Sequence, residues 1–440
     1  MKKILICLLI ILVQNTAWAI DDVKKVDLDD AIEIALKNNI DLKATQLNVI
    51  MAKNEEKVAN RLQNPSIDGF YFFGGAGWNE PKQWGLSQNI EIAKRSARKN
   101  LAKSNLKLVE KNTDYTTFDL KMDVREAYIN LVASKSILHT LEQQQELQEE
   151  LLEIAQNHVK AKKVPEIDAI QAEIALNQLI TQVNTAKVNV KQALSNFNKI
   201  INSSTPIEYD STDRIFAEEN NYNEMLTPTP TLQFPAISTL MEKALANRFD
   251  IEIAKQQIDI AEKNLTLISR QRIPDLSLSG GYAYQIGSHS DDGRFHNGAY
   301  AGINLVNIPL FYNYSPEIQN ATLKLRQAEL NYESTRNKAI KDITVAYERF
   351  LTAADNLNQY ESKIVSGSEK LIDISVDSYQ HGKSDLTSLI IMKQSYKSII
   401  VGYTLALADY YNSWTNFLRE INDEDFELNI KAEIQKTEQL

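Results

Sequence analysis

Cysteine is nearly absent from the 440-residue sequence, in which Cys7 is the single example. Cys7 lies in an apolar run, residues 4–13, which follows two lysines and precedes the small-x-small motif Ala17-Trp18-Ala19. This order is typical of a secretory signal peptide at residues 1–19, because the run is too short for a membrane-spanning anchor. We therefore expect a mature chain without a disulfide, a thiolate metal site or a cysteine for lipid attachment.

Glycine and proline are also scarce, with 14 and 10 examples, and both are clustered. The long stretches between the clusters favour helix. No apolar stretch beyond the first twenty residues is long enough for a transmembrane helix, which argues against an inner-membrane protein. The net charge of −10 argues against a nucleic-acid partner.

Motifs for catalysis are missing as well. The sequence has no nucleophile elbow, no glycine-rich phosphate loop and no paired-histidine helix, so we expect neither an enzyme nor a cofactor. His289 and His296 flank Asp291 and Asp292, and these side chains could bind a divalent cation. A solvated polar loop is the favoured interpretation, and we expect no metal site.

What the sequence does contain is one strongly alternating stretch, residues 273–284. On one side of an extended strand it places Leu276, Leu278, Tyr282 and Tyr284 around Gly280, and on the other it places small or polar residues. A run of about ten residues with one apolar and one polar face is typical of a transmembrane β-strand.

The chain also contains an internal repeat. Residues 35–41 match residues 244–250, and the match continues without gaps to Pro65 and Pro274. The sequence therefore predicts a signal peptide at residues 1–19 and two similar repeats at residues 20–202 and 236–420. An irregular linker, residues 203–235, joins the repeats, and a polar tail follows at residues 421–440.

Each repeat is predicted to contain the same four parts in the same order. A first helix ends before a proline, a β-hairpin follows, and a very long helix and a shorter return helix complete the repeat. In the first repeat, the first helix is residues 28–63 and the hairpin is residues 66–92, with strands 66–75 and 84–92. The long helix is residues 94–162 and the return helix is residues 166–198. In the second repeat, the first helix is residues 237–272 and the hairpin is residues 275–310, with strands 275–285 and 299–310. The long helix is residues 316–381 and the return helix is residues 385–419.

The predicted fold class is mixed but mainly α. Four strands cannot close a barrel, and an open sheet edge is not tolerated in lipid, so several chains must each contribute four strands. Two chains would give eight strands and a filled interior, whereas three would give twelve and a water-filled lumen. The long helices, each about 100 Å by their residue count, are too polar for lipid and would form an aqueous helical barrel. A coiled-coil scaffold without a pore is the alternative.

The sequence resembles the TolC superfamily of outer-membrane channel-tunnel proteins over nearly the whole mature chain, and within it the CzcC-like branch of heavy-metal cation efflux. Several motifs carry the resemblance: Gln88-Asn-Ile-Glu-Ile-Ala-Lys-Arg-Ser-Ala-Arg98, Arg272-Ile-Pro-Asp-Leu-Ser-Leu-Ser-Gly-Gly-Tyr282, Ile308-Pro-Leu-Phe311 and Glu317-Ile318. The sequence departs from many relatives because it has no N-terminal cysteine for lipidation.

This resemblance implies a homotrimer with a twelve-stranded barrel in the outer membrane of a Gram-negative bacterium and most of its mass in the periplasm. It implies a passive duct of a tripartite efflux system, with a periplasmic adaptor and an inner-membrane pump of the RND type as partners. Divalent heavy-metal cations are the favoured solutes. Multidrug efflux or type I protein secretion remains an alternative within the same class.

Two sets of residues are candidates for function. The turns between long and return helices would form the periplasmic tip or gate, with Glu166, Asp168, Lys383, Asp385 and Ser388. Acidic residues there could attract cations, although acidic residues are also favoured in any first helical turn. The aromatic residues expected at the lipid interface are Trp78, Trp84, Tyr282, Tyr284 and Tyr300.

A basic cluster follows the first predicted hairpin, at Lys94, Arg95 and Arg98. It lies where strand gives way to helix. The cluster fits either the periplasmic headgroup boundary or an ordinary solvated surface, and the sequence does not favour one of these over the other.

Overall fold

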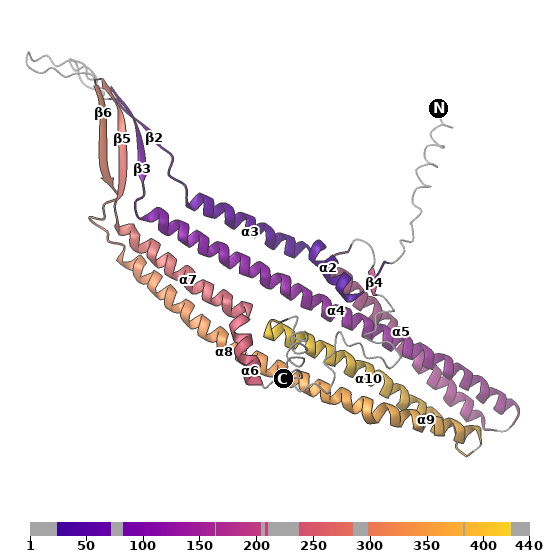
Figure 1. Ribbon diagram of the computed structural model, residues 1–440. Coiled ribbons are helices and arrows are strands. Elements are labelled where there is room, and N and C mark those ends of the chain that lie inside the picture. Colours follow the sequence, from indigo (N-terminus) through magenta and orange to yellow (C-terminus); the bar gives the residue numbers. More distant parts are fainter. Residues whose placement is uncertain are drawn as a thin grey trace, which may run out of the picture. The chain divides into compact units, whose positions relative to one another are not determined.

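The computed structural model describes residues 24–71, 82–162, 164–203, 207–209, 237–284, 298–381 and 383–423. The predicted signal peptide, the tip of the first hairpin with Trp78, most of the second tip with His289 and His296, and nearly all of the tail lie outside these residues. The described chain is mainly helical with one four-stranded sheet, which confirms the predicted fold class (Figure 1).

The chain divides into two compact units, and these do not coincide with the two sequence repeats. The helix unit contains Met1–Lys43, Thr116–Ala244 and Lys341–Leu440. The sheet unit contains Ala44–Tyr115 and Leu245–Ile340. Each unit therefore takes equivalent parts from both repeats.

The sheet unit is built on the strands β2 (Ser66–Tyr71), β3 (Lys82–Ile90), β5 (Asp275–Tyr284) and β6 (Gly298–Val306). All neighbouring pairs are antiparallel, in the order β2-β3-β5-β6, so the two hairpins join through β3 and β5 (Figure 1). Helical segments in the same unit come from α3 (Ile40–Ala59), α4 (Lys94–Lys160), α7 (Phe249–Ser269) and α8 (Ser315–Gln359).

The helix unit contains the rest of α4 and α8 together with two return helices. These are α5 (Glu166–Ile201) and α10 (Leu386–Ile421), and α9 (Val365–Gln380) precedes α10. The short helices α2 (Leu28–Asn38) and α6 (Ile237–Asn247) belong chiefly to this unit, as does the parallel pair β1 (Lys24–Val26) and β4 (Ile207–Tyr209). β4 corrects the prediction of a wholly irregular linker.

Burial in the helix unit follows the helical period. Leu141 of α4 packs with Leu179 and Val183 of α5, which are spaced four residues apart on one face. Nearer the C-terminus of α10, Phe350 of α8 contacts Trp414 and Phe417, with ring centroids 5.0 and 6.0 Å apart. Such aromatic contacts stabilise by about 1 kcal/mol each beyond area burial.

The first helix of each repeat is interrupted, which corrects the prediction of one continuous helix. The breaks fall at Asn39 and Arg248, which the repeat places in equivalent positions. Asn39 has extended ψ and its side chain accepts a hydrogen bond from the Leu42 backbone N–H at 2.9 Å, so it caps α3. Arg248 has the same backbone geometry and pairs with Asp250 at 2.8 Å.

The remaining boundaries differ in smaller ways. The predicted long helix 316–381 contains a π-helical turn at Tyr360–Ile364 between α8 and α9. β6 ends at Val306, short of the predicted residue 310, because Asn307 has a positive φ of 58° and turns the chain. The return helices both end on an asparagine in the left-handed conformation, Asn202 and Asn422.

Within the part of the chain described, none of the helices carries an apolar stretch of the length needed to traverse a bilayer.

Candidate functional site

The four-stranded sheet has one apolar and one polar face, as the alternation predicts. Cross-strand register places Leu276 and Leu278 of β5 beside Ile90 of β3 and beside Leu305 and Ile303 of β6. Side chains of this apolar face are uncovered: Ile67 is 76% exposed, Ile303 73% and Trp84 60%. An apolar face this exposed requires lipid or another protein against it.

Most residues of the opposite face, called the polar face below, are small or polar, and the exceptions are Phe70, Tyr300 and Val306. Ser277 and Ser279 of β5 lie beside Asn89 and Ser87 of β3, and Asp68 of β2 lies opposite Gly85. Ser66 and Ser87 share a hydrogen bond of 2.6 Å across this face. A face with this composition suits contact with water.

The aromatic residues predicted for the lipid interface do not all share one face. Trp84 and Tyr282 are register partners on the apolar face, and Tyr284 follows two residues later on the same side. Tyr300 is opposite Gly281, so it lies on the polar face and is removed from the predicted set. The sequence contained the signal for this, because Tyr300 alternates with Ala299, Ala301 and Ile303 and shares its side with Asn304.

The basic cluster after the first hairpin forms the junction between strand and helix. Arg98 donates to the Glu91 carboxylate at 2.7 Å and to the Ala59 carbonyl at 3.0 Å, and Arg95 donates to the Asn60 carbonyl at 2.8 Å. Guanidinium groups are favoured near the terminal carbonyls of a helix, here α3. These side chains are engaged within the protein, so the interpretation as an ordinary solvated cluster is wrong.

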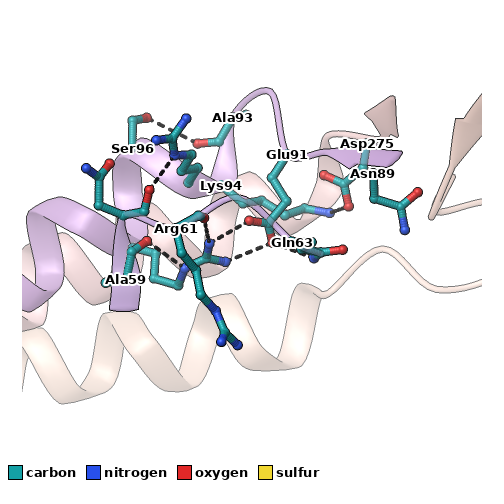
Figure 2. A network of polar contacts seen from close by, with 12 residues as sticks. Ala59, Arg61, Gln63, Asn89, Glu91, Ala93, Lys94, Ser96 and Asp275 are labelled. Atoms are coloured by element: carbon teal, nitrogen blue, oxygen red, sulfur yellow. Dashed lines mark hydrogen bonds and ion pairs between the residues drawn. The ribbon is translucent and has the colours of Figure 1, made fainter. Parts of the chain in front are cut away.

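Lys94 extends this junction to the second hairpin. Its Nζ lies 2.7 Å from Oδ2 of Asp275, and the two side chains are only 13% and 7% exposed (Figure 2). Asn307 donates to the same oxygen at 2.9 Å. The motifs that carry the family resemblance, residues 88–98 and 272–282, are therefore the residues that fasten the sheet to its helices.

The predicted tip residues of the first helical hairpin lie in the first turn of α5. Pro165 precedes this helix without a capping side chain, and Glu166 is exposed whereas Asp168 is half-buried. Burial, together with the negative charge of Asp168, raises the pKa of the Tyr379 hydroxyl on α9. Asp168 therefore faces the second hairpin within the helix unit.

The tip residues of the second hairpin cap α10. Oδ1 of Asp385 accepts a hydrogen bond from the Ser388 backbone N–H at 2.9 Å, and the hydrogen bonds from Ser388 hold the pKa of Asp385 below its ordinary value. Lys383 is exposed, and its backbone N–H donates to the Ser378 carbonyl at 2.8 Å. Asp385 and Ser388 thus have a clear local role in starting the helix.

The two hairpin ends pack against each other inside the helix unit. The Thr387 hydroxyl donates to Oε1 of Gln171 at 2.7 Å, and Leu151 and Ala172 of the first hairpin share an apolar cluster with Leu386 and Leu389 of the second. Among the described residues, no ion pair joins Glu166 or Asp168 to Lys383.

A groove of about 620 Å³ lies between α4, α5 and α10 in the helix unit. Five glutamines, Gln144, Gln148, Gln178, Gln182 and Gln394, contribute to its lining. Lys393 and Lys397 also line it, and burial lowers the pKa of both ammonium groups. Lys397 donates to Oε1 of Gln182 at 2.8 Å. Sequence reasoning missed this groove, because its lining combines the consecutive helices α4 and α5 with α10, which lies much later in the chain.

No group of three or more potential metal ligands occurs in the portion that the structure describes. Three carboxylates do lie close together, but they surround the guanidinium group of Arg419. They belong to Asp119, Asp123 and Glu126. Arg419 approaches these three side chains at 3.6, 2.7 and 4.0 Å. The cluster fastens the last turns of α10 to α4.

Comparison with known proteins agrees with this architecture. Residues 240–421 match the family model described as outer membrane efflux protein. Outer membrane protein TolC of Vibrio cholerae serotype O1 is 28% identical over 211 residues, which cover 44% of this chain and 45% of that relative. The chain thus matches less than half the length of this curated relative.

Solved structures extend the likeness to nearly the whole chain. The CmeC outer membrane channel of Campylobacter jejuni has a TM-score of 0.71 at 19% identity, covering 92% of this chain and 89% of CmeC. The outer membrane protein VceC of Vibrio cholerae has a TM-score of 0.72 at 15% identity, covering 90% and 96%. These relatives are outer membrane proteins and channels, not enzymes. Residues 240–421 therefore carry the sequence pattern of the outer membrane efflux protein family, and the chain has the fold of these outer membrane proteins.

Proposed function

We propose that this protein is a passive outer-membrane channel of an efflux system in a Gram-negative bacterium, with most of its mass in the periplasm. The observation that carries the proposal is the two-faced sheet, in which exposed Ile67, Trp84 and Ile303 lie on one side and serines, asparagines and Asp68 on the other. Lipid matches the first face and a water-filled lumen matches the second.

The sheet also supports assembly from several copies. Its outer strands, β2 and β6, have no further strand beyond them in the described chain. Unpaired backbone groups are costly in lipid, so each edge must pair with another copy. Three copies give twelve strands and leave room for a lumen, which supports a homotrimer.

The helix unit supports contact with other components. Its hairpin ends carry Glu166 and Lys383 on exposed turns, and the glutamine-lined groove farther along α4, α5 and α10 offers amide groups and two ammonium groups to a polar helical partner. A periplasmic adaptor would dock here, and an inner-membrane pump of the RND type would supply the energy.

For the solute we propose divalent heavy-metal cations, on the resemblance of residues 88–98 and 272–282 to the CzcC-like branch. Asp68 adds a chemical reason, because three copies would present three carboxylates to the lumen. Multidrug efflux or protein secretion is the alternative, since the matched family model is a general one.

The first test is conductance of the purified full-length protein in a planar lipid bilayer, together with fractionation of the cells that produce it. Discrete conductance steps and recovery in the outer-membrane fraction are expected. A protein that never conducts and remains in the soluble periplasmic fraction would instead be a scaffold without a pore.

A further inference from the structure

A row of three residues crosses the polar face of the sheet. Tyr300 of β6 is opposite Gly281 of β5, and Gly281 is opposite Gly85 of β3. Neighbouring strands lie about 4.8 Å apart, so a tyrosine ring laid across β5 can reach β3 only if both facing positions lack side chains. The sequence supplies glycine at both.

The contacts show that the ring takes this flat position. A Cβ added to Gly85 would overlap the hydroxyl oxygen of Tyr300, and Cζ of the same ring would be 3.2 Å away. Tyr300 is half-buried. The glycines thus form a floor against which the ring is packed.

The two glycines differ in what a side chain would meet. At Gly281 a Cβ would overlap the Trp84 carbonyl and lie 2.6 Å from the Gly85 Cα, so the backbone itself forbids substitution. At Gly85 the main obstacle is the far end of the Tyr300 side chain, which can rotate away, while the Gly280 carbonyl is 3.2 Å away. Alanine at position 85 is therefore tolerable once the ring moves.

The apolar face provides a matched arrangement. The Trp84 ring covers Gly69 of β2, and a Cβ there would lie 3.0 Å from Cζ3 of the indole. Substitution of Gly69 by alanine makes the same chemical change as at Gly85, but displaces an aromatic ring on the opposite side of the sheet.

We propose that Tyr300 determines the width of the lumen at its level. Packed on Gly281 and Gly85, the ring lies along the wall and the passage is wide. Lifted from this floor, the ring projects from each copy toward the axis and narrows the passage for hydrated solutes. This inference rests on the proposed function, because it requires the polar face to line a pore.

The test is single-channel conductance of four purified full-length variants, Gly85→Ala, Tyr300→Ala, Gly85→Ala with Tyr300→Ala, and Gly69→Ala. Gly85→Ala is expected to lower the conductance, and the double variant to regain the level of Tyr300→Ala. Gly69→Ala is expected to match the parent. Unchanged conductance in Gly85→Ala would overturn the proposal. So would a Gly85→Ala change that lowers the conductance of the Tyr300→Ala protein as much as that of the parent.

A second measurement applies if Gly85→Ala does not assemble. Because Cys7 is the only cysteine of the sequence, Tyr300→Cys or Tyr282→Cys in a Cys7→Ser chain introduces a single site for a bulky, water-soluble thiol reagent. Labelling at position 300 should reduce conductance, whereas labelling at 282 on the apolar face should not. No reduction at 300 would contradict the inference, whereas a parent protein without any conductance would contradict the proposed function itself.

Discussion

At the scale of single residues, Asp68 tests the ion preference of the proposed channel. It is exposed on the polar face, and the other carboxylate in the described strands of that face, Asp275, is already paired with Lys94. We predict that Asp68→Asn lowers the preference of the channel for cations over anions, because a repeated negative charge in the lumen is removed. Reversal potentials measured across a salt gradient would show this, and an unaltered potential would separate Asp68 from the conduction path.

The carboxylates around Arg419 should respond unequally to neutralisation. Burial raises the pKa of Asp119, and the negative charge of Asp123 raises it further. The positive charge of Arg419 offsets only part of this increase. A raised folded pKa favours the protonated form, so the contribution of Asp119 to stability is greatest at low pH and declines as pH rises through that pKa. Asp123 instead lies 2.7 Å from the guanidinium group of Arg419, whose positive charge stabilises the ionised carboxylate.

We therefore predict that Asp119→Asn leaves stability at pH 7 unchanged or raised, whereas Asp123→Asn lowers it by about 0.5–1 kcal/mol. Thermal unfolding followed by circular dichroism at pH 4 and pH 7 would measure both. The gain in stability of Asp119→Asn over the parent protein should be smaller at pH 4 than at pH 7. Equal losses in the two variants would mean that Arg419 pairs with both carboxylates alike.

At the scale of elements, the junction between the sheet and its helices depends on the buried pair Lys94 and Asp275. Removal of one partner leaves the other charge buried, so Asp275→Ala should destabilise the protein by about 3–5 kcal/mol. Lys94→Met combined with Asp275→Leu should cost much less than the two single changes together. The exposed pair Arg326 and Glu329 is the control, for which a loss under about 1 kcal/mol is expected. Additive effects at Lys94 and Asp275 would argue against direct coupling.

The first residue of the π-helical turn, Tyr360, lies against a glycine in the adjacent helix. A Cβ on Gly402 of α10 would lie 2.7 Å from the Tyr360 hydroxyl oxygen, and the next nearest atom would be Cζ at 3.4 Å. Gly402→Ala should therefore destabilise by roughly 1–3 kcal/mol, and Tyr360→Phe in the same chain should relieve most of this loss. Gly367 of α9 is the matched control, because no atom lies within 4 Å of its Cβ position and alanine there should stabilise by up to about 1 kcal/mol. Chemical denaturation of the detergent-solubilised protein measures these differences.

The sequence predicted the elements better than their interruptions and contacts. Residue alternation in β5 and the prolines at 65 and 274 were sufficient for the hairpins and helices, because these are local signals. The break at Asn39 was missed because its cap depends on one backbone conformation. The contact between Tyr360 and Gly402 was missed because the two residues are far apart in the sequence. The roles of Lys94 and Arg419 require partners more than 100 residues away, at Asp275 and Asp123.

At the scale of the whole molecule, each compact unit draws on both repeats. The sheet unit takes one hairpin from each repeat, and the helix unit takes one return helix from each. Duplication of one helix–hairpin–helix–helix pattern can therefore generate both the sheet unit and the helix unit. Neither repeat contains a complete sheet, so we expect neither to fold alone.

The solute class is a property of the whole efflux system, and a strain that lacks this protein tests it. A passive channel has no energy source, so its loss should trap at the pump whatever solute the pump delivers. We predict selective sensitivity to one or a few of zinc, cobalt, cadmium, nickel, copper and silver, with raised cell-associated metal measured by mass spectrometry. The intact gene should restore growth, and Asp68→Asn should restore it less well. Sensitivity to dyes and antibiotics alone would exclude metal cations as the solute while leaving the channel itself in place.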